Sequence, residues 1–219
     1  MGSENSDQVA ILPDLAAGCS MADMANLSKV RRCWDELSEI IDPEKEITPI
    51  TYINSAADLK AFCGEQDGIV CTSSNALDVL EWSFSRRHKV LFFPDQHLGR
   101  WTARQMGLKA NDIKVWDPEI KFGGLSKSEI RDSKILLWKG HCSVHQMFQP
   151  QHIDKFRSEY PDGKVISHPE CRFEVCEQSD YVGSTEYIVR NIRGINKQAP
   201  QEWVVPEGHY FVMGDNRDN

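Results

Sequence analysis

The segment Gly140–His145 places a thiol, Cys142, between the imidazole side chains of His141 and His145. It follows the apolar run Lys134–Trp138, which predicts a strand buried on both faces. Thiolate and imidazole groups are ligands that zinc and iron–sulfur centres prefer, and a turn after a strand can expose them. Because a lone cysteine is often a small core residue, packing and metal binding both stay open here.

A second thiol, Cys19, has a comparable setting, with the apolar run Val9–Leu12 before it and a helical pattern after it. The carboxyl ends of parallel strands share one edge of a sheet, so Cys19 and Cys142 could approach each other. Cys33 and Cys63 lie inside helical patterns, which predicts that they pack in the core.

The tripeptide His168-Pro169-Glu170 offers an acid–base pair on a rigid turn. Proline fixes its own φ and favours an extended conformation in the residue before it. Further along, Ser184 and Thr185 open a predicted helix, where free N–H groups can bind a carboxylate or a phosphate. The alternative for His168-Pro169-Glu170 is an ordinary surface turn, and the alternative for Ser184 and Thr185 is ordinary helix capping.

Short apolar runs alternate with helical patterns along the chain, which is typical of βαβ units and a parallel sheet. The predicted strands are Val9–Leu12, Ile47–Ile53, Gly68–Cys71, Lys89–Phe93, Lys114–Trp116, Lys134–Trp138, Lys164–Ile166 and Tyr181–Val182. The predicted helices are Ala22–Ile41, Ala56–Phe62, Ala76–Arg86, Gly99–Met106, Lys127–Asp132, Gln151–Tyr160, Glu170–Gln178 and Glu186–Arg193. The pattern therefore predicts an α/β fold.

Polar or metal-binding side chains follow six successive strands, at the points where the strands end. Asn54 and Ser73 are examples from the first half of the chain. The carboxyl ends of the strands form the ligand crevice of an open α/β sheet. Helix capping is the alternative for each serine, threonine or asparagine, but it explains little about Cys142, His145 and Glu170.

The chain has 219 residues with 25 basic and 33 acidic side chains, which gives a formal net charge of −8. This acidic balance argues against a nucleic-acid-binding protein, which needs a basic face. No apolar run approaches the ~20 residues that span a bilayer, so no membrane partner is expected. Seven cysteines, an odd number without a secretory signal pattern before them, indicate reduced thiols and a cytoplasmic location.

Several segments, in order along the chain, closely resemble those of quinolinate synthase, the iron–sulfur enzyme of NAD biosynthesis. They are Leu12–Met24, Thr51–Ser55, Cys71–Ala76, Phe93–Arg100, Trp138–His145, Ser167–Cys171 and Val182–Thr185. The resemblance covers about residues 9–195. The ordered set is very specific, although no single tetrapeptide is decisive.

The resemblance implies three similar α/β/α sandwich domains with parallel sheets in the complete family, related by pseudo-threefold symmetry. Each domain contributes one cysteine to a [4Fe–4S] cluster, and Cys19 resembles the first of these ligands and Cys142 the second. The fourth iron is left open as a Lewis acid for the substrate. The implied reaction condenses iminoaspartate with dihydroxyacetone phosphate to quinolinate, with L-aspartate oxidase as a supplier of iminoaspartate.

The resemblance also implies a role for individual residues. Glu170, His168 and Tyr52 match catalytic residues, with Glu170 as the acid–base catalyst. The implied substrate-binding set consists of Tyr52, Ile53, Asn54, Ser73, His145, His168, Pro169, Glu170, Ser184 and Thr185. These residues lie at or near predicted strand ends, where a ligand crevice is expected independently of the resemblance.

The chain departs from the family pattern at both ends. Residues 1–45 are expected to hold the end of the first α/β domain, 46–142 the second domain and 143–196 part of the third. No cysteine follows Cys176, so the third cysteine ligand of the cluster is missing from this chain.

Residues 197–219 are interpreted as an unrelated tail. Within it, residues 203–219 resemble part of a bacterial type I signal peptidase. The peptidase's nucleophilic serine, general-base lysine and membrane anchor have no counterpart, so peptidase activity is not expected. Two apolar runs around Pro206-Glu207-Gly208 predict a β-hairpin.

Two alternatives stand beside a quinolinate synthase segment. One is a catalytically inactive α/β fragment, or fusion, without a cluster. The other is a metal-binding module with two cysteines, in which His141 or Cys171 replaces the missing ligand. The number of cluster ligands separates them, because the family needs three cysteines and this chain offers two.

Overall fold

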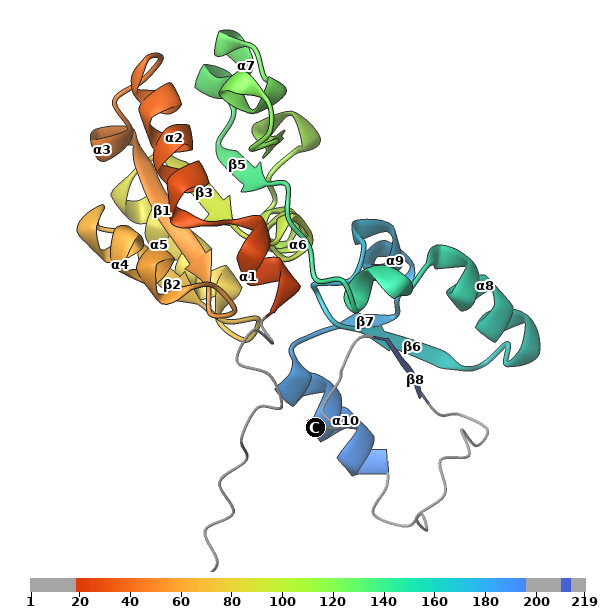
Figure 1. Cartoon of the computed structure of the whole chain (residues 1–219). Coiled ribbons are helices and arrows are strands. Elements are labelled where there is room, and N and C mark those ends of the chain that lie inside the picture. Colours follow the sequence, from red (N-terminus) through yellow and green to blue (C-terminus); the bar gives the residue numbers. More distant parts are fainter. Residues whose placement is uncertain (1–18, 196–209, 214–219) are drawn as a thin grey trace, which may run out of the picture.

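A computed structural model describes residues 19–195 and 210–213, and the fold is described for these residues. They form two parallel sheets surrounded by helices (Figure 1). The first sheet has the order β2-β1-β3-β5-β4, with β1 Ile47–Tyr52, β2 Ile69–Cys71, β3 Lys89–Phe93, β4 Ile113–Trp116 and β5 Ile135–Trp138. Every pair of neighbouring strands is parallel, which confirms the predicted α/β fold class.

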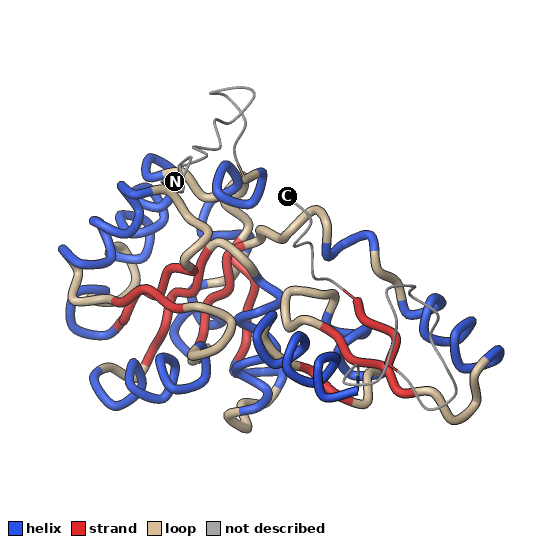
Figure 2. The backbone as a smooth tube through the Cα atoms, turned by 90° about the horizontal axis from the view of Figure 1, so that it is seen from below, coloured by secondary structure: helices blue, strands red, loops and turns tan. Residues whose placement is uncertain are grey.

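Helices lie on both sides of the first sheet (Figure 2). In this part of the chain they are α1 Ser20–Met24, α2 Leu27–Ser38, α3 Pro43–Glu46, α4 Ala57–Glu65, α5 Ala76–Arg86, α6 Gln96–Gln105 and α7 Lys127–Asp132. Short 3₁₀ helices are η1 Ala110–Asp112, η2 Lys121–Gly124 and η3 His145–Met147. None of the described helices combines the length and the apolar composition that crossing a bilayer requires.

Each face of the first sheet carries its own hydrophobic core, because successive strand residues point in opposite directions. On one face, Phe92 belongs to the same core as Leu80 of α5. On the other, Phe93 shares a core with Leu37 of α2 and Leu59 of α4. The sheet is therefore the middle layer of an α/β/α sandwich.

The second sheet has the order β7-β6-β8, with β6 Lys164–Ser167, β7 Tyr181–Val182 and β8 Tyr210–Met213. Helices α8 Pro150–Glu159, α9 Phe173–Gln178 and α10 Thr185–Ile195 belong to this part. Strand β8 lies in the segment interpreted as a tail, and it pairs in parallel with β6. The first run of the predicted hairpin lies outside the described residues, as does the predicted strand Val9–Leu12. The division into domains stays a prediction.

The helix predicted over Ala22–Ile41 is in fact two helices, α1 and α2. The break occurs at Asn26, whose side chain accepts a hydrogen bond from the Lys29 N–H at 3.0 Å and so starts α2. An asparagine side chain competes with helical hydrogen bonding in this way, because it satisfies a free N–H of the next helix.

The strand order creates a topological switch point between β1 and β3, where ligand crevices form in open α/β sheets. Tyr52 is the last residue of β1, and Asp95 follows β3 closely. Asp95 forms a parallel bridge with Gly140, and the Gln96 N–H donates to the Gly140 carbonyl at 3.0 Å. The turn that carries Cys142 therefore begins beside this crevice.

Candidate active site

Cys142, His145 and Glu170 form a compact group in which one donor atom from each residue lies within 4.8 Å of the others. Cys142 and His145 share the turn after β5, where the Gln146 N–H donates to the Cys142 carbonyl at 3.1 Å. Nδ1 of His145 lies 3.3 Å from Oε2 of Glu170. The group thus joins the end of β5, in the first sheet, to the end of β6, in the second.

Glu170 and His168 lie on the turn that follows β6. The Cys171 N–H donates to the His168 carbonyl at 2.9 Å, and the Glu170 N–H donates to His168 Nδ1 at 3.3 Å. Because Nδ1 accepts this bond, the proton of the neutral imidazole lies on Nε2. The ring of His168 stacks on that of His145 with centroids 4.8 Å apart and an interplanar angle of 23°.

The predicted helix Glu170–Gln178 starts too early. Helix α9 begins at Phe173 with Arg172 in the N-cap position, so Glu170 lies before the helix and does not occupy its first turn. The reason is local, because the N–H groups of Glu170 and Cys171 both bond back to His168. This geometry directs the Glu170 carboxylate toward His145 instead of toward solvent.

The group carries a buried ion pair at neutral pH. Burial opposes the charge of His145, but hydrogen bonds with Cys142 and Glu170 outweigh it and raise the pKa of His145 to about 10. Burial also opposes ionisation of Glu170, yet the neighbouring His145 and His168 hold its pKa below the usual value. Burial lowers the pKa of His168 to about 4. One imidazolium–carboxylate pair therefore stacks against one neutral imidazole.

Tyr52 brings the first sheet into the site. It is buried, and burial raises its pKa far above the usual value, with the neighbouring Glu170 carboxylate raising it further. The Ser73 hydroxyl acts in the opposite direction on the same pKa. The phenol therefore keeps its proton and can donate it to a hydrogen bond. Ser73, Tyr52, Glu170, His145 and Cys142 form a continuous polar line across the two sheets.

Asp95 is a further polar residue near this line, and the sequence-based set did not include it. Its side chain is fully buried, and Oδ1 accepts hydrogen bonds from the N–H groups of His97 at 2.6 Å and Leu98 at 3.1 Å. Within the described residues, Oδ2 has no hydrogen-bond partner. Burial and then the charge of Glu170 raise the pKa of Asp95 to about 8. In the sequence, an aspartate after a strand has the pattern of an ordinary helix N-cap, and Oδ1 of Asp95 does cap α6 in this way.

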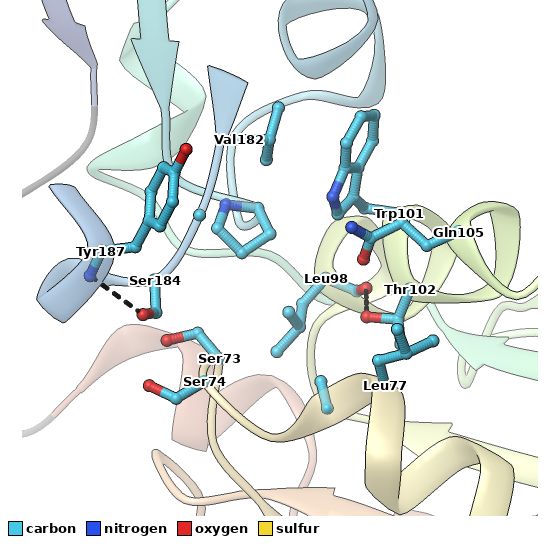
Figure 3. A pocket seen from close by; sticks show the side chains of 13 residues that line it. Ser73, Ser74, Leu77, Leu98, Trp101, Thr102, Gln105, Val182, Ser184 and Tyr187 are labelled. Atoms are coloured by element: carbon cyan, nitrogen blue, oxygen red, sulfur yellow. Dashed lines mark hydrogen bonds between the residues drawn. The ribbon is translucent and has the colours of Figure 1, made fainter. Parts of the chain in front are cut away.

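A cavity of about 260 Å³ adjoins the polar line. Three residues of the predicted set line it, namely Ser73, Pro169 and Ser184, and Figure 3 shows the two serine hydroxyls at one side of it. Four further lining residues, which the sequence analysis missed, are Trp101, Thr102, Gln105 and Tyr187. Nothing in the sequence reveals which face of α6 turns toward α10, since tertiary packing decides it.

The remaining predicted residues lie at the margin of the site. Ile53 and Asn54 are exposed on the loop after β1, outside the group formed by Cys142, His145 and Glu170. Thr185 is the first residue of α10 and is half-buried beside the cavity residue Ser184.

The sequence matches one protein family over nearly its whole length. The model of the family described as quinolinate synthetase A protein matches residues 4–209. The chain belongs to the quinolinate synthase family. Curated quinolinate synthases from Rhodopirellula baltica and Corynebacterium glutamicum are 53% and 50% identical to it over 196 and 208 residues. These matches cover 89% and 95% of this chain, but 49% and 50% of the relatives. The chain thus spans about half the length of the curated relatives it matches.

The [4Fe–4S] cluster implied for a quinolinate synthase fits the described residues only in part. The two cysteine turns lie side by side, because Oγ of Ser20 and Oγ of Ser143 are 3.0 Å apart. Cys19 is exposed and Cys142 half-buried, so both thiols are accessible. Cys171 is buried, and burial raises its pKa far above the usual value, so it does not present a thiolate. The described residues therefore supply two of three expected thiolates.

Proposed function

We propose that this chain is a segment of a quinolinate synthase that forms a wall of the active site. The reaction is the condensation of iminoaspartate with dihydroxyacetone phosphate to quinolinate in NAD biosynthesis, in the cytoplasm, with L-aspartate oxidase as supplier of iminoaspartate. One observation carries the proposal. The polar line from Ser73 through Tyr52 and Glu170 to Cys142 connects a cavity to the thiol of a cysteine turn.

Glu170 is the proposed acid–base catalyst. Its Oε2 lies 3.3 Å from Nδ1 of His145, so a proton can pass between the carboxylate and the imidazole within the buried pair. Tyr52 donates its phenolic proton toward the same carboxylate and orients it. His168, neutral and fixed by the Glu170 N–H, presents its Nε2 proton as a hydrogen-bond donor for a substrate oxygen.

Ser73 and Ser184 are proposed to bind the anionic groups of the substrates. Both hydroxyls line the cavity, and Thr185 follows at the start of α10, an 11-residue helix. A helix N-terminus and hydroxyl groups together suit a phosphate or a carboxylate. Asn54, on the exposed loop after β1, is also proposed to contact substrate.

Cys19 and Cys142 are the proposed ligands of the cluster, with the third thiolate contributed by the part of the family's length that this chain does not span. When bound, an open iron of such a cluster supplies a Lewis acid for a substrate oxygen. The neighbouring Ser20 and Ser143 hydroxyls, 3.0 Å apart, support a shared location of the two thiols.

Two experiments test this function. Anaerobic reconstitution of the chain with iron and sulfide is expected to give an iron–sulfur absorption band that Cys142→Ala removes and that Cys33→Ala, a change in the core, retains. Equal loss from both substitutions would contradict the ligand assignment. The chain alone is expected to make no detectable quinolinate.

The second experiment tests Glu170 in a complete enzyme. Residues 19–195 replace the matching segment of the Rhodopirellula baltica relative, and Glu170→Gln is introduced into this chimaera. Turnover is expected to fall by roughly 10²–10⁴, the usual effect of losing a general acid–base group, while the cluster absorbance stays. Near-normal turnover with an intact cluster would exclude the catalytic role.

A further inference from the structure

Four basic side chains lie where α6 and α9 meet, and none of them lines the cavity. They are His97 and Arg100 of α6, His141 of the turn after β5, and Arg172 at the N-cap of α9. We propose that this basic group binds the phosphate of a small molecule, at a site separate from the proposed active site. It contains no residue to which a role in the reaction or in the iron–sulfur cluster is assigned, so the inference goes beyond the proposed function.

A contact between α6 and α9 positions three members of the basic group. Trp101 of α6 packs against Phe173 of α9, with ring centroids 6.2 Å apart (Figure 1). Arg100 directly precedes Trp101, and Arg172 directly precedes Phe173. His97 lies four residues before Trp101, which places it on the same side of α6. The ring contact therefore brings both arginines and His97 to one junction.

The turn after β5 brings His141 to the same junction. The Gln96 N–H donates to the Gly140 carbonyl at 3.0 Å, and Asp95 forms a parallel bridge with Gly140. Gly140 directly precedes His141, and Gln96 directly precedes His97. The two histidines thus follow residues that are hydrogen-bonded to each other.

Electrostatic effects agree with this placement. Burial is the largest effect on His97 and lowers its pKa to about 4 together with the nearby positive groups, which are Arg100, His141 and Arg172. The carboxylate of Glu174 acts in the opposite direction on the same pKa. Burial, and then the charge of Arg172, also lower the pKa of His141. At neutral pH the basic group therefore carries two arginine charges and two neutral imidazoles.

The arginines of the basic group lack the partners that a half-buried arginine normally has. Within the part of the chain that the structure describes, neither Arg100 nor Arg172 has a hydrogen bond or an ion pair from its guanidinium. Nε of Arg172 and Nδ1 of His97 are buried atoms without such a partner. Arg87, by contrast, is half-buried and donates to two carbonyl groups and a carboxylate. Because unpaired buried polar groups cost free energy, an anion at this junction would be stabilised.

The donor types and their number favour phosphate. A guanidinium can give two parallel hydrogen bonds to a phosphate, and each imidazole can add one. The four side chains come from three segments and are all half-buried, so they can surround a tetrahedral group that is partly removed from water. A phosphate dianion offers more charge and more acceptor oxygens than a carboxylate. Since the chain has a net charge of −8, this unpaired positive group is also a local exception that attracts anions.

The test is calorimetric titration of the complete 219-residue chain with inorganic phosphate at pH 7 and low ionic strength. One phosphate is expected to bind at the basic group. Arg172→Gln and Arg100→Gln are each expected to weaken this binding by about 10–100-fold, the usual effect of losing a hydrogen bond to a charged group. Arg131→Gln removes the same charge from an exposed position on α7 and is expected to leave the binding unchanged. Unchanged affinity in both Arg172→Gln and Arg100→Gln would overturn the proposal.

The imidazole of His97 reports where the phosphate binds. Its C2 proton resonance, assigned with His97→Gln, gives the pKa of His97 by NMR with and without phosphate. The pKa is expected to rise by about 1 pH unit or more, because a bound anion offsets the positive groups that face this imidazole. An unchanged pKa at saturating phosphate would overturn the assignment. Glycerol 3-phosphate is expected to produce the same rise, and acetate is expected to bind at least about 10-fold more weakly; equal affinity for acetate would exclude a phosphate site.

Ser184→Ala separates the basic group from the cavity, which Ser184 lines. This variant is expected to keep the phosphate-dependent rise in the pKa of His97. If Ser184→Ala abolished phosphate binding and Arg172→Gln did not, the phosphate would lie in the cavity, and this proposal would fail while the proposed function stood. Circular dichroism checks that each variant is folded. Arg172→Lys keeps the charge without the planar guanidinium, so it is expected to weaken binding less than Arg172→Gln and provides a second, milder variant.

Discussion

Asp95→Asn is expected to stabilise the folded chain at neutral pH, although it changes a fully buried polar residue. Oδ1 of Asp95 caps α6 through the N–H groups of His97 and Leu98, and an amide oxygen can keep both bonds. Oδ2 has no hydrogen-bond partner among the described residues, and the nearby Glu170 carboxylate repels a charge there. At neutral pH the folded chain therefore keeps a proton on this carboxyl that the unfolded chain releases, and the amide removes this cost while it leaves the shape unchanged.

The magnitude follows from the two pKa values of Asp95. The folded chain has a pKa of about 8 at this residue, against 3.8 for a free aspartate. Between these values the folded state binds one proton more than the unfolded state, so the free energy of unfolding falls by up to about 1.4 kcal/mol per pH unit as pH rises. By pH 7.5 this cost reaches at most about 5 kcal/mol, whereas at pH 4.5 it is about 1 kcal/mol.

The amide of the variant introduces an N–H group without an acceptor, which costs about 1–3 kcal/mol at any pH. The net change is therefore a gain of about 2–4 kcal/mol in the free energy of unfolding at pH 7.5, and no gain or a small loss at pH 4.5. Urea denaturation at the two pH values, followed by tryptophan fluorescence, measures the difference.

Asp180→Asn is the matched control for Asp95→Asn. Burial opposes the charge of Asp180, but the Val165 N–H and the side chains of Lys164 and Arg157 hold its pKa below the usual value. Its stabilising effect is present above the unfolded pKa and is lost as pH falls through the folded pKa, so this variant loses less than about 1 kcal/mol at pH 7.5. If Asp95→Asn destabilised the chain equally at both pH values, its carboxylate would be satisfied in the fold, and the reasoning would fail.

Three further outcomes are expected. Lys89→Met should lower the free energy of unfolding by about 2–4 kcal/mol in urea titrations, because the buried ammonium donates to three carbonyl groups at the end of α7. The control, Lys134→Met, changes a half-exposed neighbour and should lower it by less than about 1 kcal/mol. Gly140→Ala should weaken the reconstituted iron–sulfur band, because its Cβ would lie 2.3 Å from the Pro94 carbonyl oxygen and displace the turn that carries Cys142. Gly64→Ala, in open space on α4, should leave the band unchanged. A thiol reagent followed by mass spectrometry should modify the exposed Cys19 before the buried cysteines; early modification of a buried cysteine would contradict the packing.

Much of the fold follows from apolar periodicity. The run Lys89–Phe93 was predicted as a strand with the bounds that β3 has, and α5 and α7 also begin and end where the pattern places them. Strands buried on both faces give uninterrupted apolar runs, so their signal is strong. The break at Asn26 was not predicted, although Met21 of α1 and Val30 of α2 pack in different cores of the sandwich.

The candidate site was predictable where its chemistry is visible in residue type. Cys142 and His145 have side chains that can bind a metal or transfer a proton, and Glu170 is a possible acid–base group directly after the rigid residue Pro169. The pairing of His145 with Glu170 across two sheets was not predictable, because it depends on how the sheets meet. Asp95 was missed for a different reason, since its sequence signal is that of a helix cap and only burial reveals the unpartnered oxygen.

The two sheets meet partly through buried polar contacts. The core beside the second sheet is small, and Trp101 of α6 meets Phe173 of α9 only at a centroid distance of 6.2 Å. Polar contacts made by Tyr52 and His145 with Glu170 therefore help to set how the sheets meet. Buried charged contacts add little to the free energy of unfolding, because the cost of removing the charges from water offsets their attraction. Stability alone therefore does not account for the charged residues at this contact. A variant in which neutral residues of the same shape replace these charges is therefore expected to be at least as stable as the unaltered chain, because the desolvation cost of the buried charges is removed.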